Sequence, residues 1–458
     1  MKVIVCGAGQ VGFHIAKHLA DQQNDVTVID RSVKLIRKIS ESLDVQALVG
    51  HGSDPNMLAK AGASDADLLV AVTLSDEVNM IACQVAHSLF SVPTKIARVR
   101  NQLYLDPNWR DLFSRDNLPI DVVISPELEV AQALARRLEV PGAFNMIPFV
   151  GDKVRMIGLI LEDDCPVLDT PLRQLSELFP NLRTIVVAVQ RGDRLFVPRS
   201  DDQLQSGDAI IIAVESSTTE RSMAVFGHEE QKAQRIVIVG GGSIGFALAE
   251  LLEKSERSPN VKIIEIDTER AKKIAETLEK TVVINGDALN RDILLEANIE
   301  QVDTVVSVAD DDEVNILSAL LAKQQGGAIA ITLMNNPIYG NLVGSLGIDI
   351  AIDPRETTVS SIVRHVRRGR IRDLYSLFNG QAEIIEAEVI AGSEVAQKTI
   401  GELRLHGEVK FGMIVRDGET IVPSAETQLL SGDQVVFLAV AQSVKKVEQL
   451  FSARADLF

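Results

Sequence analysis

The chain of 458 residues is poor in cysteine, aromatic side chains and basic residues. Its three cysteines, Cys6, Cys83 and Cys165, are an odd number without metal-site spacing, so we expect buried, reduced, structural thiols, as in a cytosol. Aromatic residues make up 4%. The 46 Lys and Arg against 64 Asp and Glu give a net charge of −18, which argues against nucleic acid or a bare anionic membrane as a partner.

Long hydrophobic runs are also missing. No apolar stretch approaches the ~20 residues that span a bilayer, and the first predicted strand starts at Met1 with no basic leader before it. We therefore expect a soluble protein without direct insertion into the bilayer. Hydrophobic residues at 46% and charged residues at 24% are ordinary for a globular chain, whose length predicts about three or four domains.

A long internal repeat organises the chain. VIVCGAGQVG (3–12) matches IVIVGGGSIG (236–245), and short β-branched runs alternate with helical stretches after both. This alternation is typical of parallel sheets built from right-handed crossovers. Residues 1–124 and 233–352 are therefore predicted to form two Rossmann-like nucleotide-binding domains.

A smaller unit follows each α/β domain. Residues 187–214 align with 413–440, and in both segments short alternating strands flank Gly-Asp or Asp-Gly turns. The pattern predicts small β-rich regulatory domains over residues 140–226 and 371–453, each preceded by a helix that begins at a proline. The predicted fold class is α/β, with two Rossmann-like parallel-sheet domains that are each followed by a small α+β domain.

The strongest chemical signal is a glycine-rich loop between the first strand and first helix of each α/β domain. In this context GxGxxG predicts dinucleotide binding, because the first glycine makes the turn, the second admits phosphate and the third lets the helix pack. Free helix N–H groups then face the diphosphate. The loop residues are Gly7, Ala8, Gly9, Gln10, Val11 and Gly12 in the first copy, and Gly240, Gly241, Gly242, Ser243, Ile244 and Gly245 in the second.

An acidic residue ends the second predicted strand of each copy, Asp30 in the first and Glu265 in the second. A carboxylate in this position accepts hydrogen bonds from the adenosine ribose and argues against a ribose 2′-phosphate. NAD(H), ATP and ADP share this ribose, so the residues leave the choice among them open. The alternative for each carboxylate is a solvated turn residue.

Further candidates lie at the predicted carboxyl edge of each sheet, where open α/β sheets bind ligands. Thr73 and Leu74 end the fourth strand of the first copy, and Asp310 holds the corresponding place in the second. After the third strand, His51 stands where the second copy has Asp287, as a nucleotide contact or a loop residue. With no nearby Cys or second His, a metal site at His51 is not predicted.

The tetrapeptide Asp-Glu-Val-Asn begins the helix after the fourth strand in both copies, at 76–79 and 312–315. Asp76 and Asp312 are expected to cap these helices, where a carboxylate is favourable. Capping accounts for the acidic residues but not for Asn79 and Asn315, so a role at the ligand site stays open.

The fifth strands differ between the copies. Arg98 and Arg100 stand at the crevice end of the first, whereas Leu333 and Asn335 stand in the second. A guanidinium forms bidentate bonds to phosphate and leucine does not. We predict that the first copy binds its nucleotide more tightly or prefers a different one, the alternative being that the arginines form exposed ion pairs.

Two further patterns are ambiguous. The basic run RHVRRGRIR (364–372) is either a contact to a partner or anion, or a solvated helix end. The Ser-Gly-Asp turns at 206–208 and 431–433 are explained by turn geometry, so no metal site is predicted there. Whether the small domains bind an ion stays open.

Taken together, the glycine loops, Asp30, the GHGSDP loop, the Asp-Glu-Val-Asn repeat and the Gln-Leu-x-Ser-Gly-Asp turns resemble the TrkA family, the peripheral regulatory subunits of bacterial Trk potassium-uptake systems. The resemblance covers essentially the whole chain and implies two pairs of RCK (regulator of potassium conductance) N and C domains. It implies binding of NAD or NADH and of adenine nucleotides. By matching position it assigns nucleotide contacts to Gly7 through Gly12, Asp30, Thr73, Leu74, Arg98, Gly240 through Gly245, and Glu265.

The resemblance also implies a homo-oligomeric ring, expected to be a tetramer, in the cytoplasm at the inner face of the cell membrane. Its expected partner is a membrane potassium-translocating subunit of the TrkH or TrkG type, which the chain would gate in response to nucleotide without being an enzyme. One alternative is an NAD-dependent oxidoreductase, for which we find no general acid or base placed by the sequence. Another is a regulator of a different cation channel or antiporter. Which nucleotide activates stays open.

Overall fold

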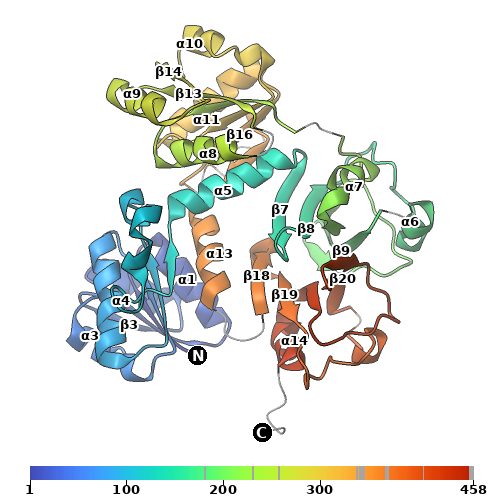
Figure 1. Cartoon of the computed structure of the whole chain (residues 1–458), viewed down its shortest axis with the longest axis horizontal. Coiled ribbons are helices and arrows are strands. Elements are labelled where there is room, and N and C mark those ends of the chain that lie inside the picture. The colour runs from blue at the N-terminus through green and yellow to red at the C-terminus, as the bar shows by residue number, and fades with distance from the viewer. Residues whose placement is uncertain are drawn as a thin grey trace. The chain divides into compact units, whose positions relative to one another are not determined.

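The computed structural model (Figure 1) describes residues 1–179, 182–229, 232–255, 258–336, 339, 346–366, 371–405 and 407–452. The chain divides into two compact units. The first joins Met1–Ala135 to Ala233–Val366, and the second joins Arg136–Lys232 to Arg367–Phe458. Each predicted domain range contains one sheet, and the domain bounds themselves remain predictions.

The first α/β domain is built on a six-stranded sheet in the order β3-β2-β1-β4-β5-β6, with every neighbouring pair parallel. Strands β1 and β4 are buried along almost their whole length, which explains their continuous apolar runs. This strand order reverses direction between β1 and β4, the place where such sheets bind nucleotides. The elements are β1 Lys2–Cys6, α1 Gln10–Asp21, β2 Asp25–Asp30, α2 Val33–Ser42, β3 Gln46–Val49, α3 Pro55–Lys60, β4 Leu68–Ala71, α4 Asp76–Phe90, β5 Thr94–Arg98 and β6 Val122–Ile124.

The second α/β domain repeats this architecture in the order β14-β13-β12-β15-β16-β17, again all parallel. The two Rossmann-like parallel sheets of the predicted fold class are therefore confirmed. The elements are β12 Arg235–Val239, α8 Ser243–Lys254, β13 Asn260–Glu265, α9 Thr268–Thr277, β14 Val282–Asn285, α10 Arg291–Glu296, β15 Thr304–Ser307, α11 Asp312–Gln324, β16 Ile329–Leu333 and β17 Ile350–Ile352.

Each sheet is followed by a helix that begins at a proline, α5 Pro126–Glu139 and α13 Pro354–Val366. Helix α13 comes from the second repeat, yet it packs beside α1 of the first (Figure 1). Its Ile362 is fully buried in the hydrophobic core of the first domain, and Val359 packs against the same core. The second half of the chain thus supplies a structural element to the first α/β domain.

The second unit contains two antiparallel five-stranded sheets, ordered β10-β9-β11-β8-β7 and β18-β19-β22-β20-β21. They confirm the predicted small α+β domains. The elements of the first are β7 Ala143–Phe149, β8 Val154–Ile160, α6 Leu172–Leu178, β9 Thr184–Arg191, β10 Arg194–Phe196, β11 Ala209–Glu215 and α7 Thr219–Val225. Those of the second are β18 Ile371–Leu377, β19 Ala382–Glu388, β20 Val409–Arg416, β21 Glu419–Ile421, β22 Gln434–Val440 and α14 Val444–Phe451.

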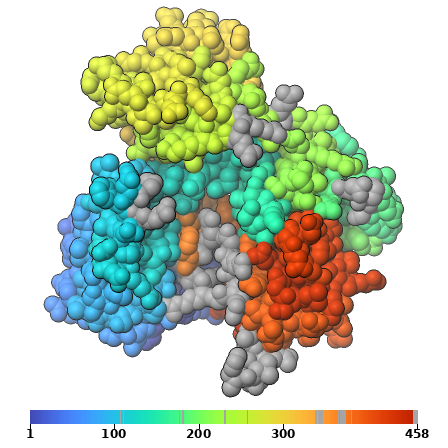
Figure 2. All heavy atoms as spheres, in the orientation of Figure 1, coloured from blue at the N-terminus to red at the C-terminus, as the bar shows by residue number. Residues whose placement is uncertain are grey.

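The two small domains pack on each other through one face of each sheet, and their surfaces meet in Figure 2 where green gives way to red. Side chains from both sheets form one core, among them Met156, Val187, Met413 and Leu438. The two sheets approach closely at Gly412, where an added Cβ would lie only 2.7 Å from the Cβ of Ala213. The duplicated small domain therefore buries against its own copy.

The Ser-Gly-Asp turns are held by an ion pair to a buried aspartate as well as by turn geometry. Asp208 is completely buried, and Arg191 donates to its carboxylate from Nε and Nη2, both at 2.7 Å. Arg416 donates to Asp433 in the same way, at 2.7 and 2.8 Å. These carboxylates are therefore structural anchors of the β-rich domains.

The remaining composition-based expectations concern cysteines, membranes and metals. All three cysteines are buried and free, and burial raises the pKa of the Cys6 thiol to about 12. Among the helices of the described residues, none combines the length and apolarity needed to cross a membrane. The described side chains include no cluster of three or more His, Cys, Asp or Glu arranged to hold a metal. Residues 367–370 of the basic run lie outside the described ranges, so its role stays a prediction.

Candidate nucleotide-binding site

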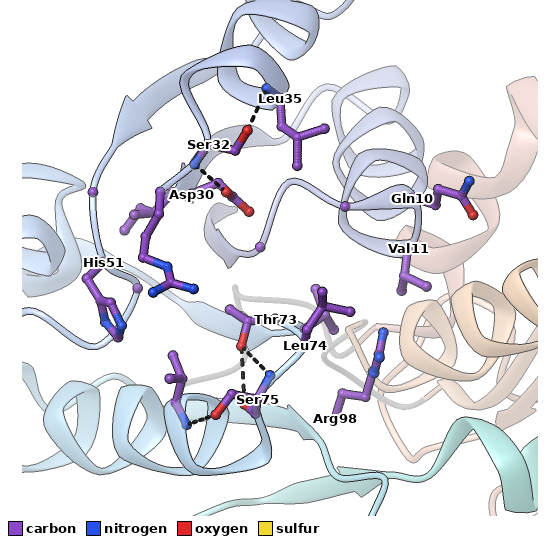
Figure 3. A pocket seen from close by; sticks show the side chains of 18 of the residues that line it. Gln10, Val11, Asp30, Ser32, Leu35, His51, Thr73, Leu74, Ser75 and Arg98 are labelled. Carbon is purple, nitrogen blue, oxygen red and sulfur yellow. Dashed lines mark hydrogen bonds between the residues drawn. The ribbon is translucent and has the colours of Figure 1, made fainter.

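A cavity of about 890 Å³ opens at the carboxyl edge of the first parallel sheet, between the loops that follow β1 and β4 (Figure 3). Its size lies within the usual range for small-molecule sites. Eight predicted residues come together in its lining: Gly7, Gly9, Gln10, Val11, Asp30, Thr73, Leu74 and Arg98. Ala8, Gly12 and Arg100 are not among the lining residues, and Arg100 instead donates from Nε to Glu127 at 3.0 Å.

The three glycines of the first loop have different physical roles. Gly7 has φ +116°, and a Cβ there would lie 2.9 Å from the backbone of Val72. A Cβ at Gly12 would lie 1.8 Å from the Gly7 carbonyl oxygen, so helix α1 packs directly on the loop. At Gly9, by contrast, none of the described residues lies within 4 Å of an added Cβ. Only Gly9 thus faces open space at the cavity, as a phosphate-admitting glycine should.

Helix α1 begins at the cavity with its first-turn N–H groups available. Its N-cap is Gly9, which has no side chain to accept a hydrogen bond from them. The positive end of the helix dipole adds to these donors, and together they favour a phosphate anion. The loop and α1 therefore form a suitable diphosphate cradle.

The Asp30 carboxylate lies in the wall of the cavity beside this cradle and is partly exposed (Figure 3). It accepts hydrogen bonds from the backbone N–H of Ala8 and of Ser32, each at 2.7 Å. These two bonds fix its orientation but leave further lone pairs on both oxygens. Asp30 is therefore positioned to accept hydrogen bonds from ribose hydroxyls.

The acidic residues of the repeated tetrapeptide do not cap their helices, so that expectation was wrong. The N-caps are Ser75, which accepts from Val78 N at 3.3 Å, and Asp311, which accepts from Val314 N at 3.0 Å. Asp76 instead accepts from the backbone N–H groups of Arg100 and Asn101, and Asp312 from those of Asn335 and Asn336. Both carboxylates fix the loop that follows the fifth strand.

Asn79 and Asn315 complete this arrangement and are both fully buried. Asn79 Oδ1 accepts from Thr73 N at 2.8 Å, and its Nδ2 donates to the carbonyls of Thr73 and Arg98 at 3.2 and 2.9 Å. Asn315 makes the same three bonds to Ala309 and Leu333. The repeated tetrapeptide therefore joins the ends of two strands at the crevice in both domains, and Asn79 is not among the residues that line the first cavity.

Arg98 is the most unusual charged group of the cavity, since it is only 9% exposed. Its Nε has no hydrogen-bond partner among the described residues. Burial, and then the nearby Arg100, lower the pKa of the guanidinium from its ordinary value. An anion bound at the α1 cradle would offset this largely buried charge, because a buried charge is costly unless it is paired.

Replacing Arg98 by leucine, the residue of the second repeat, tests this role. We expect Arg98→Leu to weaken nucleotide binding to the first site about tenfold, because one charge-assisted hydrogen bond is lost. The unliganded protein should unfold at the same or a slightly higher temperature, because a largely buried charge is removed. Calorimetric titration and a thermal scan measure the two effects, and unchanged affinity would exclude Arg98 as a phosphate contact.

The cavity also contains residues that the sequence analysis did not assign as contacts. Arg31 and Ser32 follow Asp30 directly, so proximity to the predicted acidic residue was an available signal. His51, considered there only as a contact or a loop residue, lines the cavity and bonds through Nδ1 to Ser53 at 2.9 Å. Arg355 comes from α13 of the second repeat, and no local pattern indicated it. The lining thus has three guanidinium groups against one carboxylate.

The second α/β domain has the same loop geometry with a different environment. Gly242 has the same backbone conformation as Gly9, and none of the described residues lies within 4 Å of an added Cβ. Glu265, however, is 2% exposed and accepts from the backbone N–H of Gly241 and of Asp267, each at 2.8 Å. Asp287 and Asp310 are exposed. Glu265 is therefore buried, whereas Asp30 lines the cavity of the first domain.

The positive charges of the first cavity are not repeated in the second domain. Ile266 and Leu333 hold the places of Arg31 and Arg98 in the repeat, and both are apolar. The third cavity arginine, Arg355, aligns with Glu127 of α5 when the proline-started helices are matched. The charge pattern supports the prediction that the two sites differ in their affinity for phosphates.

Comparison with known proteins identifies relatives over the whole length. The family model of the TrkA-N domain matches residues 3–126 and 236–354, and that of the TrkA-C domain matches 156–227 and 384–452. The Trk system potassium uptake protein TrkA of Azorhizobium caulinodans is 47% identical, with 100% of both chains covered. The protein of the same name from Halomonas elongata is 40% identical, also with 100% of both chains covered.

Solved structures share the fold at low sequence identity. The GsuK RCK domain has a TM-score of 0.59 at 16% identity and covers 98% of this chain and 94% of its own. The GsuK channel bound to NAD has a TM-score of 0.60 at 17% identity and covers 98% of this chain and 78% of its own. These similarities support the tandem arrangement of α/β and β-rich domains described above.

Proposed function

Because the chain belongs to the TrkA family of Trk-system potassium uptake proteins, we propose that it is a nucleotide-binding regulatory subunit of a potassium-uptake system. In this role, nucleotide binding to the α/β domains controls potassium flux through a separate membrane protein. The supporting observation is the cavity in which the open Gly9, the first turn of α1, Asp30 and three arginines meet. Such control requires that the ligand bind two states of the protein with different affinity.

The proposed ligand is NAD or NADH, with ATP or ADP as the alternative. The α1 cradle suits the diphosphate that these ligands share, and Asp30 suits their adenosine ribose. A GsuK channel structure, which has the same fold, is bound to NAD, and this supports the same ligand class here. We further propose that Arg31, Arg98 and Arg355 give the first site the higher affinity.

The proposed partner is a membrane potassium-translocating subunit of the TrkH or TrkG type. The names of the relatives support a Trk uptake system, and a homotetramer at the cytoplasmic face of the membrane is the arrangement that we propose. We assign no catalytic activity to the chain, so NADH bound to it is expected to keep its absorbance in the presence of candidate substrates.

Calorimetric titration of the full chain with NAD, NADH, ATP and ADP tests the proposed function. We expect binding to the wild type, and Asp30→Ala should remove the tighter class of sites, because the ribose loses its acceptor. Glu265→Ala should leave that class intact and affect only the second domain. Potassium flux through the membrane partner, measured with and without the bound nucleotide, then tests control of transport.

The outcomes separate the parts of the proposal. If no adenine nucleotide binds, both glycine loops are structural and the nucleotide input is excluded. Binding that does not change potassium flux would retain the nucleotide site and exclude its regulatory role. Loss of the tighter sites in Glu265→Ala instead of Asp30→Ala would reverse the assignment of the two domains.

A further inference from the structure

Arg355 joins the first nucleotide cavity to the second half of the chain. It lies in the first turn of α13, and its guanidinium lines the cavity that the first repeat forms. It donates from Nε and Nη2 to Asp353 at 2.9 and 2.7 Å, and from Nη1 to Gln10 Oε1 at 3.2 Å. One side of the guanidinium is thus paired with a carboxylate, while Nη1 points to α1.

The acceptor at Nη1 is weak compared with the ligand expected beside it. Gln10 is the first residue of α1, and it lines the cavity next to Gly9. Its side-chain amide is a neutral acceptor, whereas a phosphate oxygen forms a charge-assisted bond that is roughly twice as strong. A diphosphate seated at the first turn of α1 would therefore compete well with Gln10 for Nη1.

Movement of Arg355 would be transmitted to α13. Asp353 accepts the backbone N–H of Arg355 at 2.8 Å, so side chain and helix start are held by the same carboxylate. The helix is anchored in the first domain by Ile362, which is fully buried in that core. Helix α13 is also the last element of the second repeat before the second small domain.

We propose that Arg355 binds a phosphate oxygen of the nucleotide held by the first α/β domain, and that this contact makes the order of α13 dependent on occupancy of the site. The inference rests on the proposed nucleotide binding and adds a sensor that comes from the other repeat. The first repeat carries Glu127 at the matching position, so the device is specific to one of the two sites.

Titration of the full chain with ADP and three variants tests the contact. We expect Arg355→Ala to weaken ADP binding about 10- to 100-fold, the range for a hydrogen bond to a charged group. Asp353→Asn keeps an acceptor for the helix N-terminus but removes the competing charge, so ADP should bind about 3- to 10-fold more tightly. Arg37 is an exposed arginine of α2 that pairs with Glu41. Arg37→Ala is therefore the control for loss of one positive charge and should leave the affinity for ADP unchanged.

Hydrogen exchange of the α13 amides tests the transmission. At saturating ADP, exchange over residues 354–366 should slow in the wild type and remain at the ligand-free rate in Arg355→Ala. If the Arg355–Asp353 pair only stabilises the structure, both Arg355→Ala and Asp353→Asn should weaken ADP binding. This result would overturn the proposal. If the wild type binds ADP in an Asp30-dependent manner but Arg355→Ala binds equally well, the sensor is excluded while nucleotide binding stands.

Discussion

Gly9→Ala is expected to weaken nucleotide binding to the first domain about 100-fold while leaving the fold intact. The backbone at Gly9 is extended, with φ −64° and ψ −175°, so alanine adopts it without strain. The added methyl group meets none of the described residues within 4 Å and would project into the proposed phosphate position. Losing two charge-assisted hydrogen bonds of about 1.5 kcal/mol each would weaken binding about 100-fold.

The second repeat provides a matched control for this substitution. Gly242→Ala has the same backbone conformation and the same open surroundings, so it should be equally harmless to stability. It should leave the tighter class of sites unchanged in calorimetric titration of the full chain. Gly12→Ala is the opposite case, because its Cβ would lie 1.8 Å from the Gly7 carbonyl and should disrupt the domain. If Gly9→Ala binds NADH as well as the wild type does, the phosphate lies elsewhere.

Asn79→Ala is expected to destabilise the crevice edge of the first sheet by about 3 kcal/mol. The substitution leaves the N–H and carbonyl of Thr73 and the carbonyl of Arg98 without their amide partner. Each buried polar group that loses its bond costs about 1–3 kcal/mol, and water is expected to reach Thr73 at the cavity. Hydrogen exchange of the full chain should therefore be about 100-fold faster in β4 and β5.

Two controls make this prediction specific. Glu77 belongs to the same tetrapeptide and is exposed, so Glu77→Ala should leave exchange in β4 and β5 unchanged. Asn315→Ala should accelerate exchange in β15 and β16 and leave the first sheet unaffected, because Asn315 bonds to Ala309 and Leu333. Unchanged exchange of the β4 and β5 amides in Asn79→Ala would show that these strand ends do not depend on the asparagine. The repeated Asn would then need a different explanation.

The two α/β domains combine one loop backbone with different surrounding side chains. Gly9 and Gly242 have nearly identical backbone angles, so the backbone of the glycine loop is alike in both at this position. The difference lies in side chains around it, with Arg31 and Arg98 in one domain and Ile266 and Leu333 in the other. The two copies thus share the backbone of the glycine loop and differ in the charge at their strand ends.

The sequence by itself determined the architecture and the first cavity's main residues. Strand periodicity, glycine spacing and the repeat are local signals, because they follow from backbone geometry within a few residues. They predicted both parallel sheets, the small antiparallel domains, and the meeting of Gly7, Gly9, Asp30, Thr73 and Arg98 at one cavity.

Tertiary structure alone decided which polar residues line the cavity and which hold the strand ends. Asn79 and Asp76 lie at the crevice in sequence, but their hydrogen bonds are used by neighbouring strand ends. Glu265 has the position of Asp30 and is buried. Arg355 lines the first cavity because α13 packs on α1. Arg355 and its hydrogen-bond partner Gln10 are 345 positions apart in the sequence. Packing between distant segments depends on the whole fold, and no local pattern encodes it.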